Sequence, residues 1–190
     1  RLLASFAPSV EGAWHAAGVL ADAVRPRQAA HGLARVCAPK AHGVWSLHAM
    51  AAASGAGAFV LFSSVAALLG GAGQANYAAA NACLDALASC RRAVGAVGTS
   101  VQWGAWAEVG MAARGAASER MAAMEAASGF GRIGLAQGLA ALGTGVGHAA
   151  PSVMGVVPVT WSRFLGGDRE APAFLSAFAP VVVEAAVVAG

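Results

Sequence analysis

Short apolar runs alternate with longer stretches of helical pattern along this chain, and this alternation limits the possible folds more than any other feature. The apolar runs occupy residues 12–18, 57–64, 99–103 and 152–159. The helical patterns occupy residues 27–53, with Pro39 as a local disturbance, residues 74–92, and broken pieces within residues 114–146. Strands that are apolar on both faces are typical of parallel sheets that helices cover on both sides. The sequence therefore predicts an α/β fold with a doubly wound parallel sheet.

Polar residues and glycines stand where several of the predicted strands end. Ser63 and Ser64 end the run at residues 57–64, Gly18 ends the first run, and Gly104 follows the third. The carboxyl ends of parallel strands meet at one edge of a sheet, and such folds bind their ligands there. We therefore expect these positions to converge on one site.

The high apolar content does not predict a membrane span. Hydrophobic residues make up 58% of the 190 residues. A membrane-spanning helix needs about 20 predominantly apolar residues in a row. The longest stretch without lysine, arginine, aspartate or glutamate, residues 41–84, is interrupted by polar residues and glycines at 54–55, 63–64, 70–74 and 76. Twelve cations beside nine acids are also spread too thinly for a nucleic-acid-binding stripe.

Alanine, glycine and arginine dominate the composition, so the rare residue types become informative. The chain has one lysine, Lys40, one tyrosine, Tyr77, and two asparagines, Asn76 and Asn81. A residue that persists against such a bias is a better functional candidate than the same residue in an even composition.

The cysteines and histidines predict neither a disulfide framework nor a metal site. The three cysteines include no C-x-x-C pair, and the five histidines lack the spacing of metal ligands. Cys83 and Cys90 are seven residues apart, on one face of a predicted helix, and we expect them to be packing residues.

Four polar side chains have the spacing of a carbonyl-binding site. Ser64 and Tyr77 are thirteen residues apart, from a strand end to the first turn of the next helix. Tyr77 and Asn81 are four apart and share a helix face, while Lys40 lies on the preceding helix. A phenol with a pKa of about 10 is a poor acid–base group at neutral pH. A nearby ammonium would lower that pKa into a working range.

Several motifs together make this chain similar to a known protein family. The motifs that carry the similarity are the strand end at residues 59–64, Gly73-Gln74-Ala75-Asn76-Tyr77-Ala78-Ala79-Ala80-Asn81, Trp103-Gly104-Ala105-Trp106, Gly110-Met111-Ala112, Ala38-Pro39-Lys40 and His15-Ala16-Ala17-Gly18. Together they resemble the ketoreductase domain of type I polyketide synthases, over residues 12–164. That domain is a short-chain dehydrogenase/reductase in which the lysine and the asparagine have exchanged places.

The resemblance implies a Rossmann-like fold and a reaction. NADPH would reduce a 3-ketoacyl thioester, held on an acyl carrier protein, to the 3-hydroxyacyl thioester. Tyr77 would protonate the carbonyl oxygen and Ser64 would hydrogen-bond to it, while Lys40 would lower the pKa of Tyr77 and Asn81 would hold a proton relay. The residues expected along the cofactor path are His15, Ala16, Ala17, Gly18, Phe62, Ser63, Trp103, Gly104 and Trp106.

Purely structural roles also remain possible for some of these residues. His15 fits a core imidazole better than a catalytic group, Ser63 fits a strand-end hydrogen bond, and Trp103 and Trp106 fit core packing.

The resemblance also bears on stereochemistry. Leu20-Ala21-Asp22 is similar to the Leu-x-Asp pattern of B-type reductases, and Leu69 stands where A-type reductases carry tryptophan. A B-type outcome, a D-configured 3-hydroxyl, is therefore expected. The residues expected to face the substrate and to control its orientation are Asp22, Leu69, Gln74 and Met111.

The resemblance further predicts how the chain is organised. Residues 1–165 would form a partial ketoreductase domain with strands four to seven of the sheet and a substrate lid at about 111–142. The first βαβαβ portion, with its glycine-rich dinucleotide motif, is not found, so we expect the isolated chain to be inactive. Residues 166–190 would be a linker towards a following domain, expected to be an acyl carrier protein.

Expected partners are the carrier-bound substrate and the other domains of a synthase, in the cytoplasm, with no nucleic acid and no membrane. A fatty acid synthase ketoreductase and a truncated, non-catalytic segment of a megasynthase remain the alternatives.

Overall fold

Four parallel strands form a single sheet in the computed structural model, which describes residues 10–108, 127–166 and 171–179. In chain order the strands are β1 (Gly12–His15), β2 (Ala58–Ser64), β3 (Thr99–Trp103) and β4 (Val153–Val156), and neighbours in the chain are also neighbours in the sheet. Phe62 of β2 lies opposite Val101 of β3, and His15 of β1 lies opposite Leu61 of β2. The predicted strands are thus confirmed, although β1 and β4 are shorter than expected.

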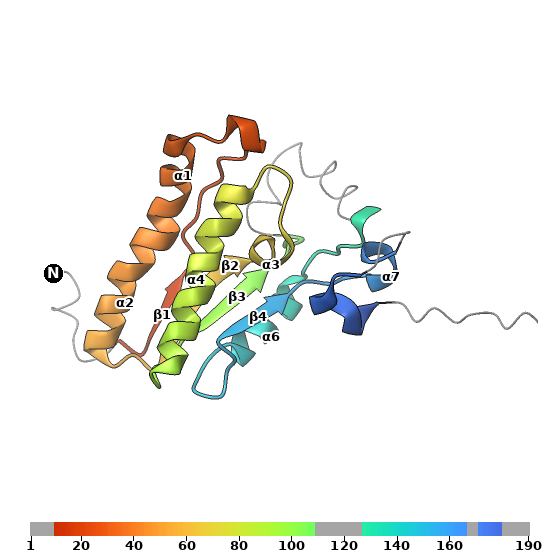
Figure 1. Cartoon of the computed structure of the whole chain (residues 1–190). Helices are drawn as coiled ribbons and strands as arrows, with labels where there is room; N and C mark the ends of the chain where they lie inside the picture. Colours follow the sequence, from red (N-terminus) through yellow and green to blue (C-terminus); the bar gives the residue numbers. More distant parts are fainter. Residues whose placement is uncertain (1–9, 109–126, 167–170, 180–190) are drawn as a thin grey trace, which may run out of the picture.

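Helices cover both faces of the sheet (Figure 1). On one face lie α1 (Ala30–Cys37), α2 (Gly43–Ser54) and α4 (Ala75–Ala93), and α6 (Leu135–Thr144) lies on the other. The shorter elements are the 3-10 helix η1 (Arg25–Arg27), α3 (Ala66–Leu69), α7 (Trp161–Phe164) and the 3-10 helix η4 (Ala173–Phe178). The predicted doubly wound α/β architecture is confirmed.

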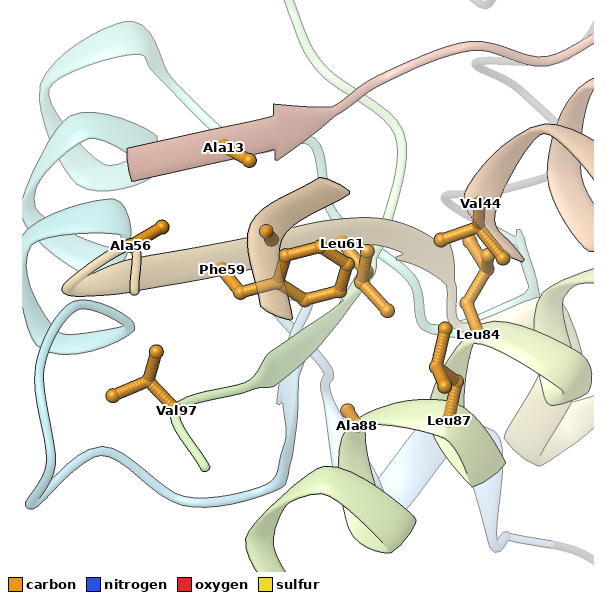
Figure 2. Packing of buried hydrophobic residues seen from close by; sticks show 10 residues of the cluster. Ala13, Val44, Ala56, Phe59, Leu61, Leu84, Leu87, Ala88 and Val97 are labelled. Atoms are coloured by element: carbon orange, nitrogen blue, oxygen red, sulfur yellow. The ribbon is translucent and has the colours of Figure 1, made fainter. Parts of the chain in front are cut away.

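The alternation of side chains along β2 explains why both faces are covered. Phe59 and Leu61 point to one face, where Figure 2 shows them together with side chains of α2 and α4. Val60 points to the opposite face and joins a second core cluster with Val101 and Ile133, against which α6 packs. Because each face of the central strand is apolar, the sheet is stable only when helices bury both sides.

The helical segment predicted at residues 27–53 contains a change of geometry. Between α1 and α2, residues Ala38–His42 form a π-helical turn, and the N–H of Gly43 donates to the carbonyl oxygen of Ala38. Pro39 lacks an N–H, and its ring would collide with the carbonyl four residues earlier in a regular α-helix. The proline therefore explains why the helix widens here and then continues.

The C-terminal part of the described chain holds more structure than a linker pattern suggests. Leu175 of η4 is buried, and the ring of Phe178 stacks on Trp161 of α7 with 4.2 Å between ring centroids. Within the expected lid, α6 packs against the sheet face through Ala141 and Leu142. Residues 111–126 of that lid, including Met111, lie outside the described residues.

Two surface features complete the fold. No helix in the described part of the chain is both long and apolar enough to cross a membrane. The expectation that Cys83 and Cys90 pack inside is wrong, because both are exposed on α4. Their spacing of seven residues places them on one helix face, but it is the face that turns away from the sheet.

Candidate active site

The four side chains with carbonyl-binding spacing come from three elements that meet at the carboxyl ends of the strands. Ser64 ends β2, Tyr77 and Asn81 lie in the first turns of α4, and Lys40 lies in the π turn between α1 and α2. The ammonium of Lys40 is 5.7 Å from the centroid of the Tyr77 ring. The side chains of Ser64 and Asn81 also act on the Tyr77 hydroxyl, where they favour its charged form. The structure therefore brings the predicted residues together.

Tyr77 is held by the residue before it. The Oδ1 atom of Asn76 accepts a hydrogen bond from the N–H of Tyr77 at 2.7 Å, and its Nδ2 donates to the carbonyl of Ala21 at 2.8 Å. Asn76 is itself buried, so both bonds are shielded from water. Asn76 thereby fastens the start of α4 to the segment that follows β1. In the sequence, Asn76 stands out only as a rare residue type, and its two hydrogen bonds could not be predicted from there.

The pKa of Tyr77 differs from the sequence-based expectation. Only 8% of the residue is exposed, and this burial raises the pKa of its hydroxyl above the ordinary value of 10. The polar side chains of Asn81 and Ser64 oppose that rise in pKa, and the carboxylate of Asp22 adds to it. The predicted lowering is therefore wrong for the described structure, because burial of the Tyr77 side chain is the largest influence on its pKa. Tyr77 is a protonated phenol, suited to donate a proton.

Lys40 is almost completely enclosed, with 3% of the residue exposed. Its Nζ donates a hydrogen bond of 2.8 Å to the carbonyl oxygen of Phe62, near the end of β2. Burial lowers the pKa of Lys40 from 10.5 to about 8, and the carboxylate of Asp85 acts in the opposite direction. Near neutral pH, Lys40 is therefore a positive charge held in a largely dry site.

Glycine at position 18 gives Lys40 its space. A Cβ atom built on Gly18 would lie 3.0 Å from Cε and 3.5 Å from Nζ of Lys40. Gly18 therefore lies against the Lys40 side chain, at the point where the chain leaves β1. Ala16 and Ala17, between β1 and Gly18, are exposed.

Asn81 and the two serines connect α4 to β2. Asn81 is fully buried, and its Nδ2 donates to the carbonyl oxygen of Tyr77 at 2.8 Å. The hydroxyl of Ser63 donates to the carbonyl oxygen of Asn81 at 3.4 Å. The hydroxyl oxygen of Ser64 accepts from the N–H of Ala66 at 3.2 Å and so helps to start α3. The serine pair therefore fixes where β2 ends relative to Tyr77.

The residues expected to control substrate orientation lie on two segments that are fastened together. The Nε2 atom of Gln74 donates to Oδ2 of Asp22 at 3.2 Å, and the N–H of Ala23 donates to the carbonyl oxygen of Gly73 at 2.9 Å. Gly73 has a φ of +74°, a left-handed conformation that favours glycine. Leu69 ends α3 and is half-buried.

The aromatic residues expected along the cofactor path pack against each other. Ring centroids are 5.7 Å apart for Phe62 and Trp103 and 4.9 Å apart for Trp103 and Trp106. Trp106 also fills the space beside Gly138 of α6, where an added Cβ would overlap its ring. At Gly104, a Cβ would lie 2.7 Å from the Val157 side chain. These positions join the strand ends to the α6 face of the core.

Asp85 is a polar residue of this region that sequence analysis missed. It lies one turn beyond Asn81, and its two carboxylate oxygens accept hydrogen bonds from Ser100 at 2.6 Å and Gln102 at 2.8 Å. Ser100 and Gln102 flank Val101, which lies opposite Phe62 in the sheet register. Asp85 thus ties α4 to β3 at the level where Lys40 contacts β2. The available signal was an acid on the Tyr77 helix, directly after the long stretch without charge.

Several known proteins are similar to this chain in sequence. The family model described as KR domain matches residues 1–108. Polyketide synthase GfsA of Streptomyces halstedii is 48% identical over 135 residues, which cover 71% of this chain and 2% of the synthase. Polyketide synthase GfsB of the same organism is 43% identical over 150 residues, covering 79% of this chain and 3% of that synthase.

Solved ketoreductases share the fold. The first ketoreductase of the tylosin polyketide synthase is 39% identical, with a TM-score of 0.72 over 86% of this chain and 35% of that one. The ketoreductase from the first module of phoslactomycin biosynthesis in Streptomyces sp. HK803 is 37% identical, with a TM-score of 0.76 over 94% of this chain and 39% of that one. The chain thus spans a small fraction of the synthases and less than two fifths of these structures.

Proposed function

The chain belongs to the KR domain family of polyketide synthases, and we propose that it carries the proton-donating half of a ketoreductase site. The substrate is a 3-ketoacyl thioester on an acyl carrier protein, and the product is the 3-hydroxyacyl thioester. The observation that carries this proposal is the pairing of a buried, protonated Tyr77 with a buried Lys40 ammonium 5.7 Å from its ring.

The described residues fit a nicotinamide cofactor with its ribose. Lys40 has three N–H donors, of which the carbonyl of Phe62 takes one. The other two can bind ribose hydroxyls, because Gly18 has no side chain to press against the end of Lys40. When bound, NADPH would supply a hydride for the carbonyl carbon. Ala16, Ala17, Ser63 and Gly104 stand at the same carboxyl edge of the sheet and would line its path.

The proton side of the reaction follows from the residues present. The Ser64 hydroxyl, whose oxygen accepts from Ala66, can donate its hydrogen to the substrate carbonyl oxygen and hold it beside Tyr77. As the carbonyl carbon gains the hydride, Tyr77 gives its hydroxyl proton to the oxygen, and the ketone becomes a hydroxyl group. The resulting phenolate is stabilised by the nearby Lys40 ammonium. Asn81 holds the path by which a proton returns to Tyr77.

The product configuration is proposed to be D, as in B-type reductases. Asp22 and Gln74 form a hydrogen-bonded pair at the end of the Tyr77 helix, and Leu69 occupies the adjacent end of α3. Gln74 of this pair lies three residues before Tyr77, at the start of α4, so the pair can fix the direction from which the thioester enters. Chiral chromatography of the product tests this point: an L-configured alcohol would contradict it.

The rest of the site is proposed to come from residues outside those described. In the described part of the chain β1 pairs only with β2, and Trp14 on β1 is 53% exposed. A further parallel strand on β1 would cover this edge and could supply the phosphate-binding turn. Residues 1–165 would then form one reductase domain with that segment, and residues 166–190 would lead to a following domain of the synthase.

The test is NADPH oxidation with a 3-ketoacyl N-acetylcysteamine thioester, using the full-length protein that carries this chain. The Tyr77→Phe variant removes the proton donor and keeps the ring. Cys83→Ser, an exposed change on the same helix, is the matched control. Turnover that Tyr77→Phe abolishes and Cys83→Ser retains supports the proposal. Turnover that survives Tyr77→Phe would refute it, and NADPH binding without any turnover would indicate a non-catalytic segment.

A further inference from the structure

The geometry of the chain around Lys40 needs support from another element. Lys40 lies in the π turn Ala38–His42, which follows α1 and precedes α2. A π turn is an uncommon interruption of an α-helix, and it shifts every following side chain around the helix axis. Pro39 already prevents a regular helix here, so the position of the Lys40 ammonium depends on what fixes the orientation of the π turn against the sheet.

His15 at the end of β1 is the side chain that contacts the turn. Its Nε2 atom is 2.8 Å from the carbonyl oxygen of Pro39, the residue directly before Lys40. A carbonyl oxygen only accepts, so Nε2 carries the hydrogen and donates it. In the π turn this carbonyl is displaced from its regular helical position, and the imidazole of a neighbouring strand gives it a donor.

The electrostatics of His15 agree with a neutral ring. His15 is 7% exposed, and burial lowers its pKa, with the Lys40 charge acting in the same direction and the Pro39 hydrogen bond opposing them. The titratable groups that face Lys40 include His15 from β1 and Tyr77 and Asp85 from α4. A neutral His15 can hold the turn without adding a second positive charge beside Lys40.

We propose that His15 is a positioning residue for Lys40: its Nε2–H fixes the Pro39 carbonyl, and with it the π turn that points the lysine ammonium at the end of β2. The consequence is visible at the other end of the side chain, where Lys40 Nζ reaches the carbonyl of Phe62 at 2.8 Å. The inference rests on the proposed function only in that Lys40 acts in catalysis.

Two other roles for His15 make different predictions. If His15 bound the cofactor, a substitution would first weaken NADPH binding. If His15 were only a core imidazole, any side chain that filled its volume would serve. A positioning role instead requires a donor at the place of Nε2.

Three variants separate these roles in the full-length protein that carries this chain. His15→Gln keeps an amide N–H at about the place of Nε2, His15→Asn keeps a shorter amide that cannot reach, and His15→Phe fills the volume without a donor. For each variant we would measure kcat, the KM for NADPH and the thermal midpoint. Misplacing a catalytic group by about 1 Å can reduce the rate about 100-fold.

A second readout does not depend on turnover. Trace acetylation of Lys40 with acetic anhydride across pH, quantified on the peptide that contains it, gives the pKa of its amine. In the unmodified protein the midpoint should lie at about 8. If His15→Phe releases the π turn, Lys40 reaches water and the midpoint should move towards 10.5.

We expect His15→Phe and His15→Asn to lower kcat about 10- to 100-fold, with His15→Gln within a few-fold of the unmodified protein and the KM for NADPH little changed. The Lys40 midpoint should rise in the first two variants only. If His15→Phe fails to fold, His15→Gln against His15→Asn makes the same comparison. Should the protein lack turnover altogether, the labelling alone decides.

Three results would overturn the inference. The first is a Lys40 midpoint that stays at about 8 in His15→Phe and His15→Asn. The second is an equal loss of kcat in His15→Gln and His15→Phe at unchanged thermal midpoints. The third is a raised KM for NADPH at unchanged kcat, which would assign His15 to cofactor binding.

Discussion

Replacing Lys40 with methionine should stabilise the fold while it removes the activity. The pKa of Lys40 falls from 10.5 to about 8 on burial, which corresponds to about 3 kcal/mol, at about 1.4 kcal/mol per pH unit, of folding free energy lost in keeping the lysine charged. Methionine has a similar length and no charge, so it removes this cost. It also removes the donor to the Phe62 carbonyl, which offsets part of the gain. We expect a net stabilisation of about 1–3 kcal/mol at pH 7.

The stability gained by Lys40→Met should depend on pH, and its direction follows from the lowered pKa of Lys40. Between pH 8 and 10.5 the unfolded chain keeps the lysine proton and the folded chain has lost it. The unfolded state then binds more protons, so the stability of the unmodified protein rises with pH in that window. Lys40→Met has no such proton to lose. Its advantage should therefore be largest at pH 7 and shrink towards pH 10.

The assay is urea unfolding followed by tryptophan fluorescence, at pH 7 and at pH 10, on a reductase domain that contains this chain. Arg35→Met, which removes an exposed cation from α1, is the matched control and should change the unfolding free energy by no more than about 0.5 kcal/mol. Lys40→Met equal to or less stable than the unmodified domain at pH 7 would refute the reasoning. So would a gain that is the same at both pH values.

Three further predictions use other parts of the structure. The rate of reduction should fall as pH rises above about 8, approaching tenfold per pH unit, because Lys40 then loses the charge that stabilises the Tyr77 phenolate; a pH profile of kcat that stays flat to pH 9.5 would contradict this. Gly138→Ala should destabilise the fold by about 1–3 kcal/mol, because the added Cβ would overlap the ring of Trp106. Gly143→Ala in the same helix places its Cβ in open space and should stabilise the fold by about 0.5–1 kcal/mol. Thermal melting of the two variants compares these effects. Asn76→Ala should lower the thermal midpoint and kcat together, because it loses both hydrogen bonds at the start of α4, and unchanged values of both would count against that role.

The sheet could be predicted from the sequence because each strand is a local apolar run with a recognisable end. The run at residues 57–64 is apolar on both faces and ends in two hydroxyls, and β2 occupies Ala58–Ser64. The helix that carries Tyr77 and Asn81 followed from the helical pattern at residues 74–92 and from the glycine-rich loop before it. Local pattern alone therefore placed Ser64, Tyr77 and Asn81 on the correct elements.

Features that depend on contacts between distant segments could not be predicted from the sequence. Pro39 predicted a disturbance, but the π turn is held by His15, 24 residues earlier in the chain. The direction of the Tyr77 pKa depends on burial, and burial is set by the packing of α1, α3 and α4 around the side chain. The burial of Cys83 and Cys90 could not be predicted for the same reason. Their spacing shows that they share a helix face, but it does not show whether that face packs against the sheet or is exposed to water.

The two perturbed groups of the site make sense together. Burial disfavours the charged form of each, so it raises the pKa of Tyr77 and lowers that of Lys40. Before proton transfer only the lysine is charged, and its positive charge has no directly bonded carboxylate in the described part of the chain. In the proposed reaction, a negative charge forms beside this ammonium when Tyr77 gives up its proton, and both unfavourable burials are relieved at once. An interaction that strengthens only as the proton leaves lowers the barrier rather than the energy of the resting state. The stability lost at Lys40 in the resting protein is therefore the same electrostatic imbalance that favours proton donation.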